Sequence, residues 1–107
     1  MALIVHSVAL EMVGAIRPLV GRIRARDRSL ADQLSRAASS VVLNISEAEY
    51  SDPGNRRARF HTAAGSNREA RAALQLAAAW GYIATGDTLS AERLADRVQA
   101  MLWRLAH

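Results

Sequence analysis

The sequence predicts an all-α protein, folded as an antiparallel up-and-down four-helix bundle. Half of its 107 residues are hydrophobic but only 5% are aromatic, so small and aliphatic side chains must fill the core. Six glycines and two prolines are too few for the many turns of an all-β fold. Apolar residues also recur at helical spacing along most of the chain. One domain, residues 1–107, with a single modest core is expected at this length.

The first helix is predicted from about residue 2 to residue 26. Its apolar residues form one stripe at about 100° per residue. The stripe consists of Val5, Val8, Ala9, Met12, Ile16, Leu19, Val20 and Ile23. Pro18 lies within this helix, and because its ring presses on the carbonyl of Gly14, a kink or a break is expected there. Leu10 and Val13 lie off the stripe, which indicates a second contact surface.

The apolar start of the chain, from Met1 to Ile16, does not have the features of a signal peptide. It lacks a basic amino-terminal region, and His6 and Glu11 interrupt its apolar residues. It is also too short and too polar to span a bilayer. The chain has no cysteine, which fits a reducing compartment. A cytoplasmic protein without membrane contact is therefore expected.

The second helix is predicted over residues 29–50, capped by Asp27 or Ser29. Its stripe consists of Leu30, Leu34, Ala37, Val41, Ile45 and Ala48. Asn44 lies at the edge of that stripe, so its amide is expected to be half-buried and hydrogen-bonded. Leu43 and Tyr50 point the opposite way, and such a pair favours an oligomer.

The third helix is predicted over residues 53–80. Its start is set by Asp52 as N-cap and Pro53 at the first helical position. Its end is set by Gly81, which can adopt the left-handed conformation after the last turn. It carries two stripes, one of Phe60, Ala64, Asn67, Leu74 and Ala78 and the other of Gly65, Ala73, Leu76 and Trp80. A helix that is apolar on two faces is covered on both, by its own bundle and by a further surface.

The fourth helix is predicted over residues 88–106, capped by Asp87 or Ser90, with Tyr82 and Ile83 packed against the bundle end before it. Its expected stripe is Leu94, Val98, Met101 and Leu105, with Trp103 opposite. Short connections make consecutive helices antiparallel. The residues left off the stripes form the candidate oligomer interface: Leu43, Tyr50, Leu76, Trp80 and Trp103.

The charge pattern points to anionic partners. All 14 basic residues are arginine and the formal net charge is +4. In an antiparallel bundle, one arginine cluster lies at each end, and these form the candidate nucleic-acid-binding set. The set is Arg22, Arg24, Arg26, Arg28 and Arg36 with Arg56, Arg57 and Arg59. No aromatic residue is interleaved with them, so single-strand base recognition is not indicated. Solvated helix ends that complement the helix dipole remain an equal alternative.

The sequence offers no support for catalysis, for a metal site or for a cofactor. His6, His61 and His107 do not stand in Glu-x-x-His pairs, and no phosphate-binding loop is present. The serines Ser39, Ser40 and Ser46 have no evident base beside them. Glu47 and Glu69 lie on neighbouring helices, and pairing with Arg36, Arg68 or Arg71 is favoured over a carboxylate pair.

Two stretches carry a family resemblance. The run from Asp32 to Glu47, DQLSRAASSVVLNISE, resembles the D-Q-L-R-R-A-A-x-S-x-x-x-N-I-A-E-G signature of the four-helix-bundle proteins encoded in 23S ribosomal RNA intervening sequences. The run from Arg59 to Glu69 resembles that family's R-F-x-x-x-A-x-G-S-x-x-E stretch, and Gly81-Tyr82-Ile83 resembles its G-Y-I helix end. The likeness extends from about Arg17 to His107.

The resemblance implies a ring-like homopentamer without an inherited catalytic residue. A related branch, the accessory variability proteins of diversity-generating retroelements, implies RNA or DNA and a partner protein such as a reverse transcriptase as possible ligands. The matching residues Asn44, Glu47, Gly65, Ser66 and Glu69 are interpreted as a polar lock between helices, in which Gly65 allows close helix approach. Ser35 and Ala48 depart from the signature, and together with an acidic loop after the second helix they reduce the positive charge there.

Two hypotheses follow. The first is a non-enzymatic homo-oligomeric adaptor that contacts RNA or DNA through arginine clusters, without sequence-specific readout. The second is a protein–protein scaffold whose oligomer is the functional unit and whose arginines are only solvated. An enzyme or a metal-binding bundle is disfavoured by the missing ligands.

Overall fold

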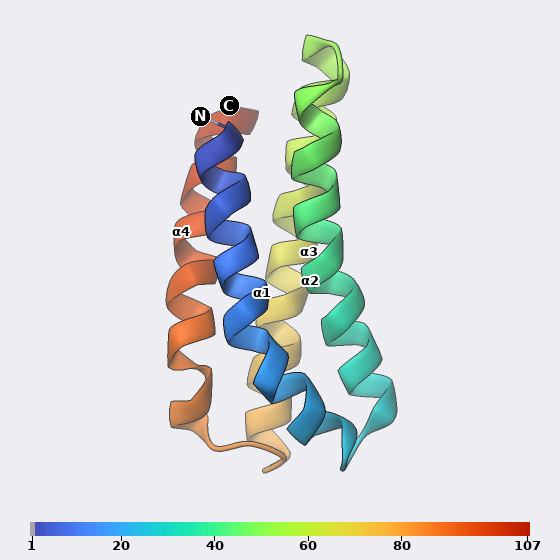
Figure 1. The fold of residues 1–107 in the computed structure, drawn as a ribbon, viewed down its shortest axis with the longest axis vertical. Helices are drawn as coiled ribbons and strands as arrows, with labels where there is room; N and C mark the ends of the chain where they lie inside the picture. The colour runs from blue at the N-terminus through green and yellow to red at the C-terminus, as the bar shows by residue number, and fades with distance from the viewer. Residues whose placement is uncertain (1) are drawn as a thin grey trace.

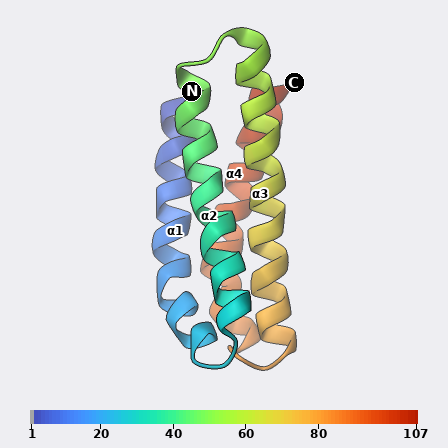
Figure 2. The same cartoon turned by 90° about the vertical axis from the view of Figure 1, so that its right-hand side faces the viewer.

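The computed structural model describes residues 2–107, which form four long α-helices and one short 3-10 helix. The elements are α1 (Ala2–Arg24), α2 (Arg28–Glu49), α3 (Pro53–Ala79), η1 (Thr85–Thr88) and α4 (Leu89–Ala106). The helices alternate in direction, and α1 also packs against α4, which closes the bundle (Figures 1 and 2). The described residues contain no strand. The predicted four-helix architecture is confirmed, with helix ends within two residues of their expected positions.

Side-chain caps fix the starts of α2 and α3 as predicted. The Asp27 carboxylate accepts a hydrogen bond from the Leu30 N–H at 3.0 Å, and the Asp52 carboxylate accepts one from the Asn55 N–H at 3.0 Å. At the end of α3, Gly81 adopts a φ of +79°, a conformation that glycine adopts at little cost. The Gly81 N–H then donates to the Ala78 carbonyl at 3.0 Å, which satisfies one of the last free carbonyls of the helix.

The start of α4 differs from the prediction. Neither Asp87 nor Ser90 caps this helix, because the chain enters it directly from η1 at Leu89. The Asp87 carboxylate instead turns back and accepts a hydrogen bond from the Ala84 N–H at 3.0 Å. The Thr88 hydroxyl donates to the Glu92 carboxylate at 2.7 Å across the first turn. A 3-10 turn running straight into an α-helix removes the need for a separate cap residue.

Helix α1 continues through Pro18 without a break. Pro18 is exposed, so its ring meets no neighbouring helix, although the helix has lost one backbone donor there. The axis of α1 changes direction towards its lower end (Figures 1 and 2), as a proline within a helix produces. Of the two predicted outcomes, the kink is the one observed.

The apolar segment of α1 extends beyond Ile16, where the apolar start of the chain was expected to end. Ile4–Arg24 spans 21 residues with a mean hydropathy of 1.4, which is enough to cross a membrane by length and composition. Seven side chains of this helix instead fill the bundle core: Val5, Val8, Ala9, Met12, Ile16, Leu19 and Ile23. Packing against α2 and α4 therefore accounts for part of its apolar character: 33% of the apolar window is buried, while Ile4 and Leu10 stay exposed.

The predicted stripe of α2 is buried throughout, and Phe60, Ala64, Asn67 and Leu74 of α3 are buried as well. Ile83 is also buried and Tyr82 is half-buried, as expected. The stripe of α4 is corrected. Its buried residues are Ala91, Ala95, Val98, Leu102 and Ala106, while Leu94, Met101 and Leu105 are half-buried along one edge. The small alanines face the bundle axis, where neighbouring helices approach most closely, and the longer side chains flank them.

Candidate functional site

The first arginine cluster lies at the bundle end where α1 passes into α2. Arg22 pairs with Asp87 at 2.9 Å, and Arg24 pairs with Asp32 at 2.7 Å. Hydrogen bonding from Arg24 lowers the pKa of Asp32 below its ordinary value of 3.8. The carboxylates therefore stay ionised at neutral pH. The four arginines of this cluster face Asp27, Asp32 and Asp87, so its net charge is only +1.

An aromatic residue does interleave with these arginines, which corrects the expectation from sequence. The guanidinium of Arg26 lies over the ring of Tyr82, 5.6 Å from its centroid. Tyr82 stacks on Trp80 with 6.4 Å between centroids, and its hydroxyl donates to the Asp27 carboxylate at 3.2 Å. Burial, followed by this bond to Asp27, raises the pKa of the Tyr82 hydroxyl above its ordinary value.

The second arginine cluster lies at the tip of the α2–α3 hairpin, which projects beyond both chain termini (Figure 1). Arg59 pairs with Glu47 at 3.0 Å, and the Nε of Arg56 donates to the Ala48 carbonyl at 3.2 Å. The same tip carries Glu49 and Asp52, so its three arginines face three carboxylates. This end therefore has no net charge, because the acidic end of α2 lies beside the basic start of α3.

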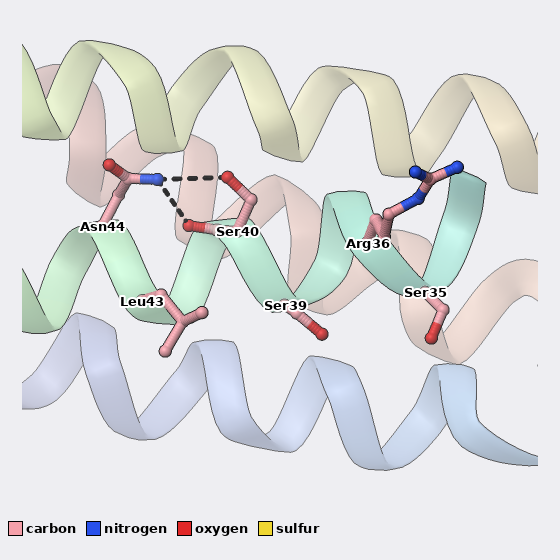
Figure 3. A pocket seen from close by; sticks show the side chains of 6 residues that line it. All are labelled: Ser35, Arg36, Ser39, Ser40, Leu43 and Asn44. Carbon is pink, nitrogen blue, oxygen red and sulfur yellow. Dashed lines mark hydrogen bonds between the residues drawn. The ribbon is translucent and has the colours of Figure 1, made fainter. Parts of the chain in front are cut away.

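The polar lock between α2 and α3 is present in part. The Asn44 amide donates to the Ser40 carbonyl at 2.9 Å and to the Ser40 hydroxyl at 3.1 Å, as the dashed lines in Figure 3 show. The Ser40 and Ser66 hydroxyls are 2.8 Å apart and link the two helices. The predicted half-burial and hydrogen bonding of Asn44 are thus confirmed.

Two other members of the lock behave differently from the prediction. A Cβ placed on Gly65 would meet nothing closer than an Arg68 guanidinium nitrogen at 4.0 Å, so close helix approach does not require this glycine. Glu69 was expected to pair with an arginine but forms none of the four ion pairs found among residues 2–107. It instead borders a polar depression of about 380 Å³ between α2 and α3.

The ion-pair partners also differ from those expected. Glu47 pairs with Arg59 instead of Arg36, Arg68 or Arg71. Arg71 reaches across to Asp96 on α4 at 2.7 Å. Arg36 is exposed, and its Nε lies 3.4 Å from the Asp32 carbonyl.

All five side chains of the candidate oligomer interface are exposed, by 46% to 88%. They do not form one patch. Leu43 lies in α2 and Tyr50 directly follows that helix. Leu76 lies in the last turn of α3 and Trp80 directly follows it, while Trp103 lies near the end of α4. The ends of α3 and α4 lie at opposite ends of the bundle (Figures 1 and 2). A surface built from these residues must therefore use more than one face of the protein.

Three large apolar side chains outside the candidate oligomer interface are also exposed: Ile4, Leu10 and Leu89. Leu10 borders a groove of about 430 Å³ between α1 and α2, in which Arg17 is the charged residue. The remaining lining is Val13, Gly14, Ile16, Val20, Ser35, Ala38 and Ser39. Leu43 continues this surface along α2, pointing to the same side as Ser39 and Ser35 (Figure 3). We call it the α1–α2 face; the off-stripe positions of Leu10 and Val13 were its signal in the sequence.

The opposite side of the bundle, which we call the α3–α4 face, collects arginines. Its basic residues are Arg57, Arg68, Arg71, Arg93, Arg97 and Arg104, and its carboxylates are Glu92 and Asp96. Arg104 lies at the edge of this face, where it also lines a pocket with Ile4 of α1. Arg57 is shared with the hairpin tip, where it is already balanced, and the other five arginines against two carboxylates leave a net charge of +3. This face was not evident from the sequence because α4, counted from Asp87, is neutral overall. Plotting its arginines around the helix would have shown that they share one side.

No group of three or more His, Cys, Asp or Glu side chains that could hold a metal ion occurs in the part of the chain that the structure describes. The depression on the outer surface of α2 is shallow and lined by Ser35, Arg36, Ser39, Ser40, Leu43 and Asn44 (Figure 3). Its serine hydroxyls have no histidine or carboxylate among the lining residues that could activate them.

These features define a small helical-bundle protein with one apolar and one arginine-rich face. The sequence model of the 23S rRNA-intervening sequence protein family matches residues 1–104, and the chain belongs to this family. Its fold is similar to that of a crystal structure from Bacteroides thetaiotaomicron VPI-5482, described as a protein with unknown function from the S23 ribosomal protein family. The two chains are 20% identical with a TM-score of 0.87, over 95% of this chain and 97% of the other. No curated protein matches the chain.

Proposed function

We propose that this protein is a non-enzymatic, homo-oligomeric adaptor of the cytoplasm that contacts RNA or DNA through arginines, without reading its sequence. The observation that carries the proposal is the division of the surface. An apolar groove lies between α1 and α2, while a net charge of +3 collects on the α3–α4 face. One face suits a second copy of the chain, and the other suits an anionic polymer.

Self-association is supported by the exposed apolar side chains. Leu10 is 51% exposed and Leu43 is 63% exposed, and both border the α1–α2 face. Small residues such as Gly14 and Ser39 within the groove would let a partner helix approach closely. A ring of five copies, as the family resemblance implies, would use this face together with a second apolar region such as that around Leu76 and Trp80.

Nucleic-acid binding is supported by the arginine excess and by the family's association with 23S rRNA intervening sequences. Arginine offers bidentate, permanently charged contacts to phosphate. A further protein partner, such as a reverse transcriptase, would dock on the assembled oligomer.

A salt titration tests the nucleic-acid part of the proposal. Binding of the wild-type protein to a structured RNA, measured by fluorescence anisotropy, should be strongest at about 50 mM salt and should fall steeply towards 200 mM. Light scattering at micromolar concentration tests the oligomer on the same sample. Undetectable RNA and DNA binding at the lower salt concentration would refute nucleic-acid binding, whereas a monomeric mass would refute self-association.

A protein–protein scaffold without a nucleic-acid role is the second candidate. It is favoured by the pairing of Arg22 with Asp87 and of Arg24 with Asp32. These ion pairs neutralise positive charge that would otherwise contact nucleic-acid phosphates. An oligomer that forms normally while all nucleic-acid probes fail to bind at low salt would select this candidate.

A further inference from the structure

A row of three arginines runs along the outer side of α4. Arg93, Arg97 and Arg104 are spaced i, i+4 and i+11, which places them within about 40° of one another around the helix. All three are exposed, and none pairs with a carboxylate among residues 2–107. Their charges are therefore available to an external anion, in contrast to those of Arg22 and Arg24.

A second row with the same spacing lies on α3. Arg57, His61 and Arg68 are exposed and are also spaced i, i+4 and i+11. Contacts between the helices keep the two rows side by side: Gln75 donates to Glu92 at 3.1 Å, and Arg71 pairs with Asp96 at 2.7 Å. The two rows therefore flank a strip along the bundle whose centre holds the Gln75–Glu92 and Arg71–Asp96 contacts.

The strip ends in an exposed aromatic stack. Trp103 is 61% exposed, and its ring lies nearly parallel to the ring of His107, with 4.4 Å between centroids and 14° between planes. His61 meets His107 edge-on at 5.3 Å. A His107 ring nitrogen also lies 2.9 Å from the Trp103 carbonyl oxygen, within hydrogen-bonding distance. These contacts cover one side of the indole and leave most of the rest open to solvent.

We propose that the α3–α4 face binds a single-stranded segment of nucleic acid, with phosphates held by the arginine rows and an unpaired base stacked on Trp103. This inference rests on the nucleic-acid part of the proposed function and adds the surface and the strand state. Phosphates contribute affinity through cation contacts, and an exposed aromatic ring adds stacking that any unpaired base can use. A duplex keeps its bases stacked internally, so it can use the arginine rows but cannot use Trp103.

Neutralising the α4 row tests the phosphate contacts. The triple variant R93Q/R97Q/R104Q should reduce the salt slope for a fluorescent oligouridine by about 2, since each lost single-strand phosphate contact contributes about 0.7. Affinity at about 50 mM salt should fall roughly tenfold or more. The matched control R22Q/R24Q/R28Q removes the same charge from the α1–α2 end and should change both values much less. The charge-preserving variant R93K/R97K/R104K should retain the slope.

Removing the indole tests the stacking. Trp103→Leu should weaken binding to oligouridine by about 5- to 150-fold, the range that loss of one base–aromatic stack produces. Its affinity for a duplex RNA of the same length should stay unchanged. Trp103→Phe is the matched control, because it keeps an aromatic ring at the same position and should retain most of the oligouridine binding. Circular dichroism melting and light scattering establish that each variant keeps its fold and its mass.

The outcomes separate the two proposals. A wild-type protein that binds no nucleic acid refutes the proposed function itself. A wild-type protein that binds, with equal losses in the α4-row variant and in its matched control, overturns the placement on the α3–α4 face but leaves the proposed function intact. An α4-row loss combined with unchanged oligouridine binding by Trp103→Leu overturns single-strand stacking, since phosphate contact alone would then explain the affinity.

Discussion

The α1–α2 half and the α3–α4 half of the bundle share one apolar core but differ in their polar contacts. Apolar side chains make most of the contact between α1 and α2, with Arg24 and Asp32 paired at its exposed end. Between α3 and α4, the fully buried Asn67 amide donates to the Ala95 carbonyl at 2.9 Å and to the Gln99 side chain at 2.8 Å. The outer surfaces follow the same division, apolar over α1–α2 and basic over α3–α4. One small bundle can thus present two unlike faces, each suited to a different partner.

The largest expected effect is on the apolar side. Leu43→Asp places a carboxylate on the α1–α2 face, and burying it unpaired in an interface would weaken self-association by about 100-fold or more. Light scattering over a concentration series measures the shift towards monomer. Leu89→Asp is the control, because Leu89 is 53% exposed at the start of α4, outside the groove. Equal masses for Leu43→Asp and the wild type would show that this face is not an interface.

On the polar side, Asn67→Ala removes two hydrogen bonds from the interior of the α3–α4 half. The free energy of unfolding should fall by about 1–3 kcal/mol, because the buried donors are lost and a small cavity remains. Urea unfolding followed by circular dichroism measures the change. Thr62→Ala, at an exposed position of the same helix, should stay within about 0.5 kcal/mol of the wild type. A comparably small effect for Asn67→Ala would mean that polar contacts do not hold this half together.

A smaller gain is expected from Gly14→Ala in the groove of the α1–α2 face. A Cβ at Gly14 would meet nothing within 4 Å, and the residue lies within a helix. The substitution should raise stability by about 0.5–1 kcal/mol. The measurement belongs in the Leu43→Asp background, where association does not contribute to unfolding. Gly65→Ala should give a similar gain in stability, because a Cβ there would meet no atom closer than 4.0 Å. A clear loss of stability in Gly65→Ala would instead show that this glycine is needed for close approach of the helices.

The smallest expected effect is a loss of stability at low pH, which involves carboxylates at the two ends of the bundle and not those on either face. The Ala84 N–H and, after it, Arg22 lower the pKa of Asp87, and the Asn55 N–H lowers that of Asp52, both from an ordinary value of 3.8. Because these pKa values are depressed in the folded state, the stability that they contribute is present above pH 3.8 and is lost as the pH falls below it. The melting temperature should therefore drop below about pH 4, less steeply for Asp87→Asn than for the wild type. Identical acid profiles for the two proteins would contradict this assignment.

Much of the fold was predictable because it depends on interactions within a few residues. The stripes of α1 and α2, the Asp52 cap and the left-handed Gly81 all act within one or two helical turns. The stripe of α4 was predicted wrongly because the centre of the buried face consists mainly of alanines. The larger side chains of Leu94, Met101 and Leu105, on which the prediction was based, lie at the edge of that face. Apolar size is a poor guide where helices pack closely through small residues.

The candidate surfaces were predictable only in part. The exposure of Leu43, Tyr50, Leu76, Trp80 and Trp103 followed from their positions around each helix. Their distribution over separate faces did not, since that depends on which helices are neighbours and in which direction they run. The groove between α1 and α2 likewise exists only once the two helices lie side by side.

The sequence by itself determined four amphipathic helices, their caps and an arginine excess, because helical periodicity and capping are local. Only the tertiary structure decided where that charge is available. Arg22 meets Asp87, and Arg26 meets Tyr82, across more than fifty residues of chain. The outer side of α4, in a helix of balanced composition, becomes the most basic strip. The physical reason is that charges interact over about 10 Å through space, whatever their separation along the chain.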